Sequence, residues 1–187
     1  MRTNHHNHKV CPWWKAYTFD NLFRRLIHKP EKMFAGLVKE GMTVVDIGAG
    51  MGFFSIAMAR MVGDSGKVIS VDIQSKMIKT LEKRARKRGV ADKIQTILCK
   101  PDDICVKEKA DFILAFYVVH EVPDIRHLFQ QVIACMKPET RFLVVEPSMH
   151  VSSNEFEQTL KLAIDSGLIL LNRPKILLSR SALFGLV

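Results

Sequence analysis

Apolar residues along this chain fall into two kinds of segment. Short, almost continuous apolar runs predict buried strands near residues 43–47, 67–72, 94–99, 111–116 and 141–146. Between these runs, apolar residues return every three or four positions and predict helices near residues 52–62, 75–88, 125–136 and 153–165. Strands that alternate with helices in this way predict an α/β fold, in which helices cover both faces of a mostly parallel sheet.

Both ends of the chain extend this pattern. Pro30 favours the start of a helix over residues 31–39, because a proline at the first helical position loses no hydrogen bond. Residues 168–171 and 176–186 predict an antiparallel hairpin that closes the sheet. We therefore expect a disordered polar leader over residues 1–10, a helical and aromatic lid segment over 11–40 and one domain over 41–187.

Length and composition fit a single domain with a full core. The chain has 187 residues, and hydrophobic residues make up 48% of them. No apolar run approaches the roughly 20 residues of a membrane-spanning helix, and the first residues lack the apolar core of a signal peptide. We therefore expect a cytoplasmic protein. The four cysteines have no paired metal spacing, so we expect no metal site.

A formal net charge of +9 leaves an anionic partner open. Much of this charge lies in residues 79–88, on a helix whose other face carries Met77, Ile78, Leu81 and Ala85. The cations are therefore interpreted as the solvated side of an amphipathic helix. No aromatic residues alternate with them, so no base-stacking surface is indicated.

A glycine-rich turn follows the first predicted strand. Its residues are Val44-Val45-Asp46-Ile47-Gly48-Ala49-Gly50-Met51-Gly52-Phe53-Phe54. Such a turn before a helix lets the backbone approach a nucleotide-like ligand closely. A dinucleotide site needs its third glycine where Phe53 stands, and a phosphate-binding P-loop needs a closing Gly-Lys-Ser/Thr, which is not present.

The second predicted strand ends in an acid, Asp72, which lies 20 residues after Gly52. An acid at the end of this strand faces the glycine turn and can accept hydrogen bonds from both hydroxyls of an adenosine ribose. The turn and Asp72 together therefore predict a cofactor that contains adenosine.

The order of these motifs resembles that of class I S-adenosylmethionine (SAM) dependent methyltransferases, in their small-molecule, type 11-like branch. The resemblance rests on the pattern Asp-x-Gly-x-Gly-x-Gly, on Asp72 and on the segments 111–122 and 136–146, and it covers about residues 30–187. It implies a Rossmann-like, doubly wound, seven-stranded and mostly parallel sheet that binds SAM and releases S-adenosylhomocysteine. Glu139 and Thr140 replace the two glycines of the family's turn before the fifth strand.

The resemblance also implies a set of cofactor ligands. The turn would hold the methionine part, Asp72 the ribose and Ile73 the adenine ring. The family's acidic adenine ligand aligns near Lys100, and Asp102 is the nearby carboxylate that we choose. The full expected set is Asp46, Gly48, Ala49, Gly50, Gly52, Phe53, Asp72, Ile73, Asp102 and Phe116.

Catalytic and acceptor-binding candidates follow the fourth and fifth strands. His120 is the first candidate base, because an imidazole titrates near neutral pH, and Glu121 is the second. His120 could equally order its loop through a neighbouring carboxylate or carbonyl. The candidates for acceptor binding are Trp13, Trp14, Tyr17, Glu146 and His150.

Three functions remain open at this point. Methyl transfer to a small-molecule acceptor is favoured over methylation of nucleic acid, because the fourth strand lacks the Asn/Asp-Pro-Pro-Tyr/Phe motif of exocyclic amine methyltransferases. A non-catalytic SAM-binding protein is the third possibility. The sequence gives neither the acceptor nor the oligomeric state.

Overall fold

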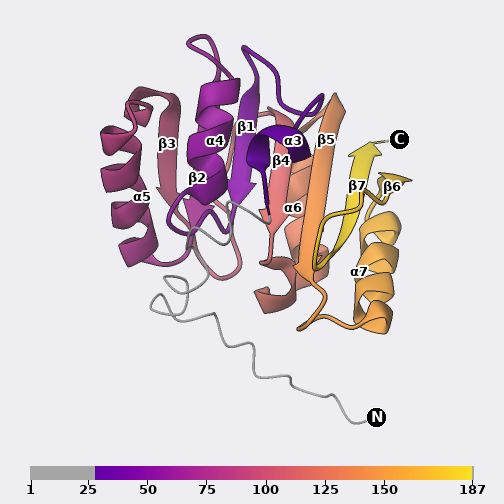
Figure 1. The fold of residues 1–187 in the computed structure, drawn as a ribbon. Coiled ribbons are helices and arrows are strands. Elements are labelled where there is room, and N and C mark those ends of the chain that lie inside the picture. The colour runs from indigo at the N-terminus through magenta and orange to yellow at the C-terminus, as the bar shows by residue number, and fades with distance from the viewer. Residues whose placement is uncertain (1–27, 187) are drawn as a thin grey trace.

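The computed structural model describes residues 28–186, which form one seven-stranded sheet with helices on both faces (Figure 1). The strand order is β3-β2-β1-β4-β5-β7-β6, and β7 is the one strand among these that runs in the opposite direction to the others. The strands are β1 (Thr43–Ile47), β2 (Lys67–Asp72), β3 (Ile94–Leu98), β4 (Ala110–Phe116), β5 (Met136–Pro147), β6 (Leu168–Asn172) and β7 (Ser179–Leu186). The predicted fold class, including the closing hairpin, is confirmed.

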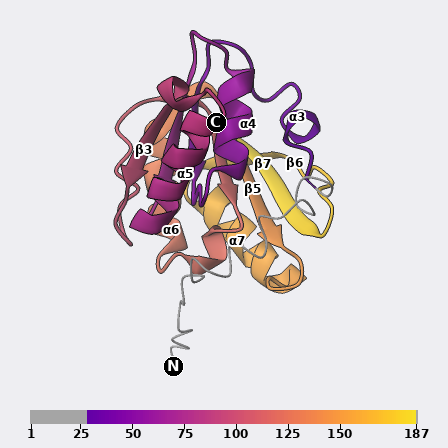
Figure 2. The ribbon, with the colours of Figure 1, turned by 60° about the vertical axis from the view of Figure 1, so that its left-hand side comes forward.

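The helices divide between the two faces of the sheet, as Figure 2 shows from the side. They are α3 (Pro30–Met33), α4 (Phe53–Met61), α5 (Ser75–Lys87), α6 (Ile125–Cys135) and α7 (Ser153–Asp165). Buried side chains of α4 and α5 share one hydrophobic core, against which Met33 of α3 packs, and those of α6 and α7 share the other. The sheet therefore separates two cores.

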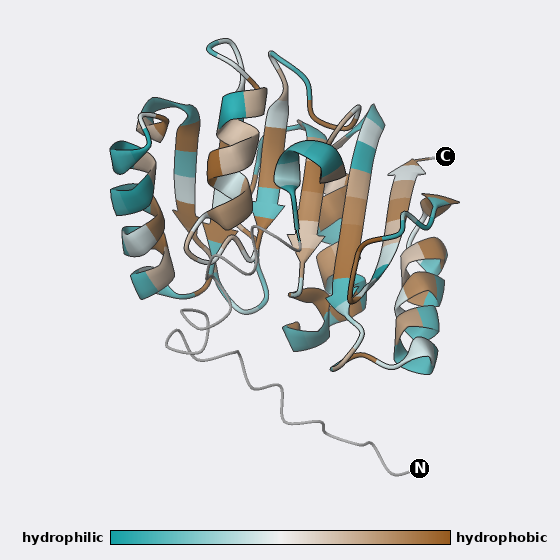
Figure 3. Ribbon diagram, in the orientation of Figure 1, coloured by the Kyte–Doolittle hydropathy of each residue, from teal (hydrophilic) through white to brown (hydrophobic). Residues whose placement is uncertain are grey.

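This double covering explains the continuous apolar runs in the strands. Val44 belongs to the core beneath α4, whereas its neighbour Val45 belongs to the core beneath α6. Since successive side chains of a strand point to opposite faces, both faces must be apolar. Figure 3 shows the result as apolar strands between helices whose polar residues face outward.

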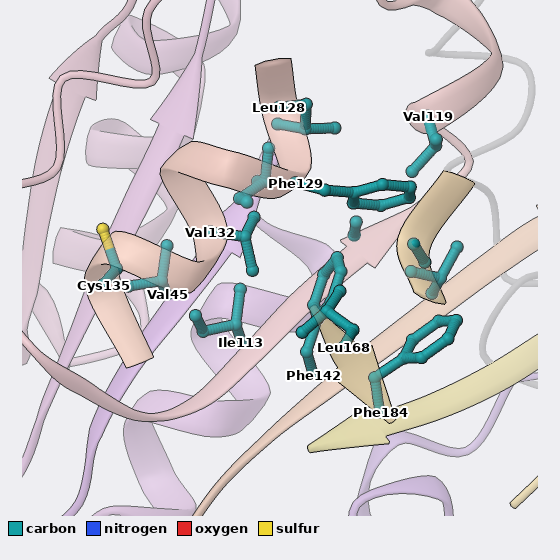
Figure 4. Close-up of a cluster of buried hydrophobic side chains, with 14 of the residues drawn as sticks. Val45, Ile113, Val119, Leu128, Phe129, Val132, Cys135, Phe142, Leu168 and Phe184 are labelled. Atoms are coloured by element: carbon teal, nitrogen blue, oxygen red, sulfur yellow. The ribbon is translucent and has the colours of Figure 1, made fainter. Parts of the chain in front are cut away.

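Aromatic side chains fill much of the core on the α6 and α7 side (Figure 4). The ring of Phe142 on β5 lies 6.1 Å from that of Phe129 on α6 and 6.1 Å from that of Phe184 on β7. All three residues are fully buried. Through Phe142 on β5, these contacts join α6 to the closing hairpin.

The predicted helix over residues 31–39 is wrong in its extent, because α3 has only four residues, Pro30–Met33. Gly36 has φ +78°, which a continuous right-handed helix does not allow. Phe34 is fully buried and lies edge-on to Phe54 and Phe112. Packing of this one side chain therefore outweighs the local helical pattern.

The segment of the expected turn before the fifth strand lies inside β5, which runs from Met136 to Pro147. The pairing with β4 shifts between Ala110 and Phe112, which leaves an irregular stretch around Thr140. The Thr140 hydroxyl accepts a hydrogen bond from the Lys137 N–H at 2.7 Å and donates one to the Ala110 carbonyl at 2.5 Å. These two bonds take over the role of the missing glycines.

The closing hairpin begins later than predicted on its second strand, at Ser179 rather than residue 176. Leu178, just before it, has φ +57°, which a residue in an extended strand does not adopt, so the strand can begin only after it. Among the helices of residues 28–186, none is long and apolar enough to cross a membrane.

Candidate active site

The candidate site lies where the strand order reverses, between β1 and β4. From β1 the chain proceeds outward to β2 and β3, and from β4 it proceeds the other way to β5. In such sheets ligands bind beyond the carboxyl ends of the strands at this switch point. The glycine turn follows β1 there, and the segment with His120 follows β4.

The glycine turn has the backbone shape that the sequence predicts. Gly48, Gly50 and Gly52 have φ of +70°, +54° and +82°, values that residues with a Cβ rarely adopt. A Cβ at Gly48 would lie 2.7 Å from Val118, and one at Gly52 would lie 2.6 Å from Leu81. These two glycines therefore allow close packing, against the segment after β4 and against α5.

Gly50 differs from the other two glycines of the turn. A Cβ at Gly50 would meet no protein atom within 4 Å, although Gly50 lines the large cavity of the site. The turn therefore leaves free space in front of Gly50, as a backbone that must approach a ligand requires.

Asp72 joins the end of β2 to this turn. Its carboxylate accepts hydrogen bonds from the N–H groups of Gly50 and Gln74, each at 2.8 Å, and it also lines the cavity. Burial raises the pKa of this carboxyl, and the backbone hydrogen bonds only partly oppose that effect. Each carboxylate oxygen has a second lone pair, so Asp72 can still accept from a ligand hydroxyl.

Asp46 lies behind the turn and does not line the cavity. It is 1% exposed, and its Oδ2 accepts a hydrogen bond from the Ser55 hydroxyl at 2.5 Å. This bond ties the end of β1 to the first turn of α4. In this structure Asp46 supports the glycine turn, and its place among the expected cofactor ligands stays a prediction.

The cavity has a volume of about 540 Å³, which falls in the usual range for small-ligand sites. One side is formed by the glycine turn and the end of β2, and the other by the segments after β4 and β5. Of the predicted site residues it includes Gly48, Gly50, Asp72, Ile73, Asp102, Phe116, His120, Glu121 and His150. The structure thus brings together residues that the sequence spreads over a hundred positions.

Other predicted residues lie elsewhere. Ala49, Gly52, Phe53 and Glu146 do not line the cavity, although Glu146 contacts it through His120. The aromatic candidates Trp13, Trp14 and Tyr17 lie outside the described residues, as do the leader over 1–10 and most of the proposed lid.

The loop after β3 forms the wall next to Asp72. The side chain of Gln131 on α6 holds this loop, since it donates to the Asp102 carbonyl and accepts from the Ile104 N–H, both at 2.8 Å. Lys100 and Asp102 both line the cavity, so the geometry leaves the choice of adenine ligand between them open. Burial and the charge of Asp72 raise the pKa of the Cys99 thiol to about 11, which keeps it protonated at neutral pH.

His120 and Glu146 form a pair at the opposite wall. Glu146 Oε2 makes a short hydrogen bond to His120 Nδ1, and Glu146 Oε1 accepts from the Val119 N–H at 3.0 Å. Burial alone would lower the pKa of His120, but the hydrogen bond and charge of Glu146, with the charges of Glu121 and Glu155, raise it above its usual value. The sequence did not predict this pair, because 26 residues separate its members.

Tyr117 is a further cavity residue that the sequence analysis did not select. Its φ of +60° is unusual for a bulky side chain and indicates local strain at the end of β4. Its hydroxyl lies 2.7 Å from that of Ser179, and its ring centroid lies 4.2 Å from that of Phe116. In the sequence, the one indication that Tyr117 belongs to the site is its position directly after Phe116.

The family is decided by comparison with known proteins. A family model described as a methyltransferase domain matches residues 38–172, well over half of the chain. The chain belongs to the methyltransferase domain family. The match spans β1 through β6 and includes every residue of the cavity.

Relatives and solved structures agree with this assignment. The chain is 28% identical over 134 residues to the ubiquinone/menaquinone biosynthesis C-methyltransferase UbiE of Enterobacter sp. (strain 638), a match that covers 71% of this chain and 48% of the relative. It thus spans about half the length of this relative. A SAM-dependent methyltransferase from Aquifex aeolicus has a TM-score of 0.86 at 24% identity and covers 95% of this chain and 100% of its own.

A third comparison concerns a protein crystallised with the cofactor. The fibrillarin of Aeropyrum pernix with natively bound S-adenosyl-L-methionine has a TM-score of 0.64 at 16% identity and covers 91% of this chain and 74% of its own. This likeness shows the shared fold. The predicted class I methyltransferase family and its Rossmann-like domain are therefore confirmed for this chain.

Proposed function

We propose that this chain binds SAM in the cavity and transfers its methyl group to a small-molecule acceptor. The observation that carries the proposal is that the free space in front of Gly50, the Asp72 carboxylate and the His120 imidazole all open into one cavity of about 540 Å³. A volume of this size accommodates a cofactor with part of an acceptor.

The residues present fit the cofactor. At Gly50 the backbone borders open space that a Cβ would partly fill. The oxygens of Asp72 can accept further hydrogen bonds, from ribose hydroxyls. Ile73 and Met77 supply apolar surface beside Asp72 for an adenine ring. When bound, SAM supplies a sulfonium methyl group that is already activated for displacement. The chain then has to orient the acceptor, exclude water and, where the acceptor carries a proton, remove it.

The acceptor side of the cavity is largely apolar. Val118, Val122, Pro123 and Leu128 line it together with His120. Apolar walls beside the imidazole of His120 suit a flat, weakly acidic ring compound. The name of the UbiE relative refers to ubiquinone and menaquinone biosynthesis, and a quinone precursor with a ring hydroxyl is accordingly the acceptor class that we propose.

Cofactor binding is tested by titration calorimetry with SAM, S-adenosylhomocysteine and NAD. Binding of the first two and not of NAD is expected, and binding of NAD alone would refute the proposal. A ligand at 100 times its dissociation constant adds about 2.7 kcal/mol to the free energy of unfolding. A thermal-shift series with the same ligands should therefore show a rise of several degrees for the two adenosyl sulfur compounds.

The acceptor is tested next, with methyl-labelled SAM and a panel of phenols, hydroxyquinones and short RNA and DNA oligonucleotides. Label transfer to a small hydroxylated ring compound supports the proposal. Transfer to nucleic acid instead would make the chain a nucleic-acid methyltransferase, and binding without any transfer would favour a non-catalytic protein. A cytoplasmic location also stays a prediction, which cell fractionation checks.

A further inference from the structure

Glu146 is an almost completely buried ionisable residue next to the cavity. It is 1% exposed at the carboxyl end of β5, and both its oxygens are engaged by the segment after β4. The parallel pairing of β4 and β5 sets Phe116 beside Val145, so the residues that follow each strand meet. Burial of a carboxylate is costly unless hydrogen bonds compensate it, which here they do.

The hydrogen bonds of Glu146 determine where the proton of His120 sits. Oε1 accepts from the Val119 N–H, and an ionised carboxylate can only accept hydrogen bonds. The imidazole nitrogen that faces Oε2 must therefore be the one that carries the proton, and that nitrogen is Nδ1. The other nitrogen, Nε2, lies 3.9 Å from Oε1 of Glu121, which lines the same cavity.

We propose that Glu146 is a positioning residue that keeps the proton of neutral His120 on Nδ1, so that Nε2 presents its lone pair to an acceptor in the cavity. The proposal rests on the proposed function for its catalytic consequence, but the placement of the proton does not depend on it. In methyl transfer, His120 takes the acceptor's proton at Nε2. The electron pair that the proton leaves forms the bond to the methyl carbon, and the former carbon–sulfur pair stays on sulfur.

Glu146 also stabilises the imidazolium ion that this step produces, because its negative charge lies next to Nδ1 of His120. Several other charged or titratable groups lie around the ring. Glu121 and Glu155 add negative charge near it, Asp124, His127 and His150 line the same cavity, and Arg180 is the cross-strand partner of Glu146 on β7. Removal of Glu146 should therefore change the properties of His120 more than removal of any other carboxylate.

The variant Glu146→Gln gives a direct test. Its amide oxygen can still accept from the Val119 N–H, and its amide nitrogen then faces Nδ1 as a donor. Nδ1 must accept, so the proton moves to Nε2 and the lone pair is turned away from the acceptor. The tautomer and pKa of His120 are read from long-range proton–nitrogen NMR spectra of histidine-labelled protein without cofactor, with His120→Gln to assign the signal.

The expected result is an Nδ1–H tautomer in the wild type and an Nε2–H tautomer in Glu146→Gln. Glu121→Gln serves as the matched control and should keep the Nδ1–H tautomer. An Nε2–H tautomer in the wild type overturns the proposal by itself, so the test does not depend on how well Glu146→Gln folds. The same tautomer in wild type and Glu146→Gln overturns it as well.

Kinetics then connect the proton to the reaction. Glu146→Gln should lower kcat by about 100-fold or more, as expected for loss of a general base, while the Kd for SAM changes less than about threefold. Glu157→Gln, which removes an exposed carboxylate on α7, should do neither. Unchanged kcat in Glu146→Gln refutes the positioning role. Failure of the wild type to bind SAM refutes the proposed function and leaves the tautomer result standing.

Discussion

Gly50→Ala separates the two reasons for a glycine in the turn, which are backbone conformation and free space. The residue has φ +54°, and a left-handed conformation costs a residue with a Cβ about 1–2 kcal/mol. A smaller entropy of the unfolded chain returns about 0.4–1 kcal/mol of this. Since no protein atom lies within 4 Å of the added Cβ, no clash adds to the cost. The net loss of stability should be about 0.5–1.5 kcal/mol.

Cofactor affinity should fall by more than this strain explains. The new methyl group points into the space that the cofactor is proposed to fill, and displacement of a closely packed group costs about 1–3 kcal/mol. The Kd for SAM should therefore rise by about 5- to 150-fold. Titration calorimetry measures this change, and thermal unfolding should show a fall in Tm of about 1–6 °C.

The matched control is Gly89→Ala, after the end of α5. Gly89 has φ +65°, and an added Cβ there also meets no atom within 4 Å, but Gly89 does not line the cavity. It should lose similar stability and keep its affinity for SAM. Equal affinities of Gly50→Ala and Gly89→Ala would refute the idea that the space before Gly50 receives the cofactor.

Four more predictions concern the same site and its support. Asp72→Ala should raise the Kd for SAM by about 10-fold or more, since hydrogen bonds to a charged group contribute about 1.5–3 kcal/mol. Its unfolding free energy, measured in urea, should change by less than about 1 kcal/mol, because the cost of burying the carboxylate disappears together with the hydrogen bonds that it accepts. Ser55→Ala should lower the unfolding free energy by about 1–3 kcal/mol, because it removes a hydroxyl from the buried Asp46 carboxylate; an unchanged urea midpoint would contradict this. Turnover should rise with pH through a pKa above about 6.5, since His120 must be neutral to accept a proton. The raised pKa of His120 also stabilises the folded state. This contribution is complete below about pH 6.5 and is lost as the pH rises through the pKa of His120 in the folded protein. The difference in unfolding free energy between wild type and His120→Gln should therefore shrink from pH 6 to 8.5.

The sequence predicted those parts of the fold that depend on local pattern. Strands such as β1 and β2 are apolar on both faces, and the glycine turn and Asp72 mark their ends, so their positions agree with the structure within a residue or two. The edge of the sheet that carries the site could be predicted from the parallel strands alone. The strand order was not predicted, because periodicity carries no information about which strands are neighbours.

The remaining features depend on contacts between distant segments. Phe34 is buried against Phe54 and Phe112 where the predicted helix was expected to continue, and the bonds of Thr140 hold an irregular stretch near the start of β5. The pair of Glu146 and His120 was missed for the same reason, although both residues had been selected separately. Once β4 and β5 are known to be neighbours, their pairing register brings the two together. The information missing from the sequence analysis was therefore the pairing register of β4 and β5, which no sequence motif gives.

The hydrogen bond from Gly50 to Asp72 has a consequence for the kinetics of the cofactor. It holds the turn in shape through the protein's own groups, and the bonds from Gly48 and Ala49 to the Val71 carbonyl do the same at 2.9 Å. A preorganised turn loses little conformational entropy on association. Encounter with the cofactor therefore needs no slow rearrangement of the turn, and differences in affinity among variants of the turn should arise mainly from how fast the cofactor leaves.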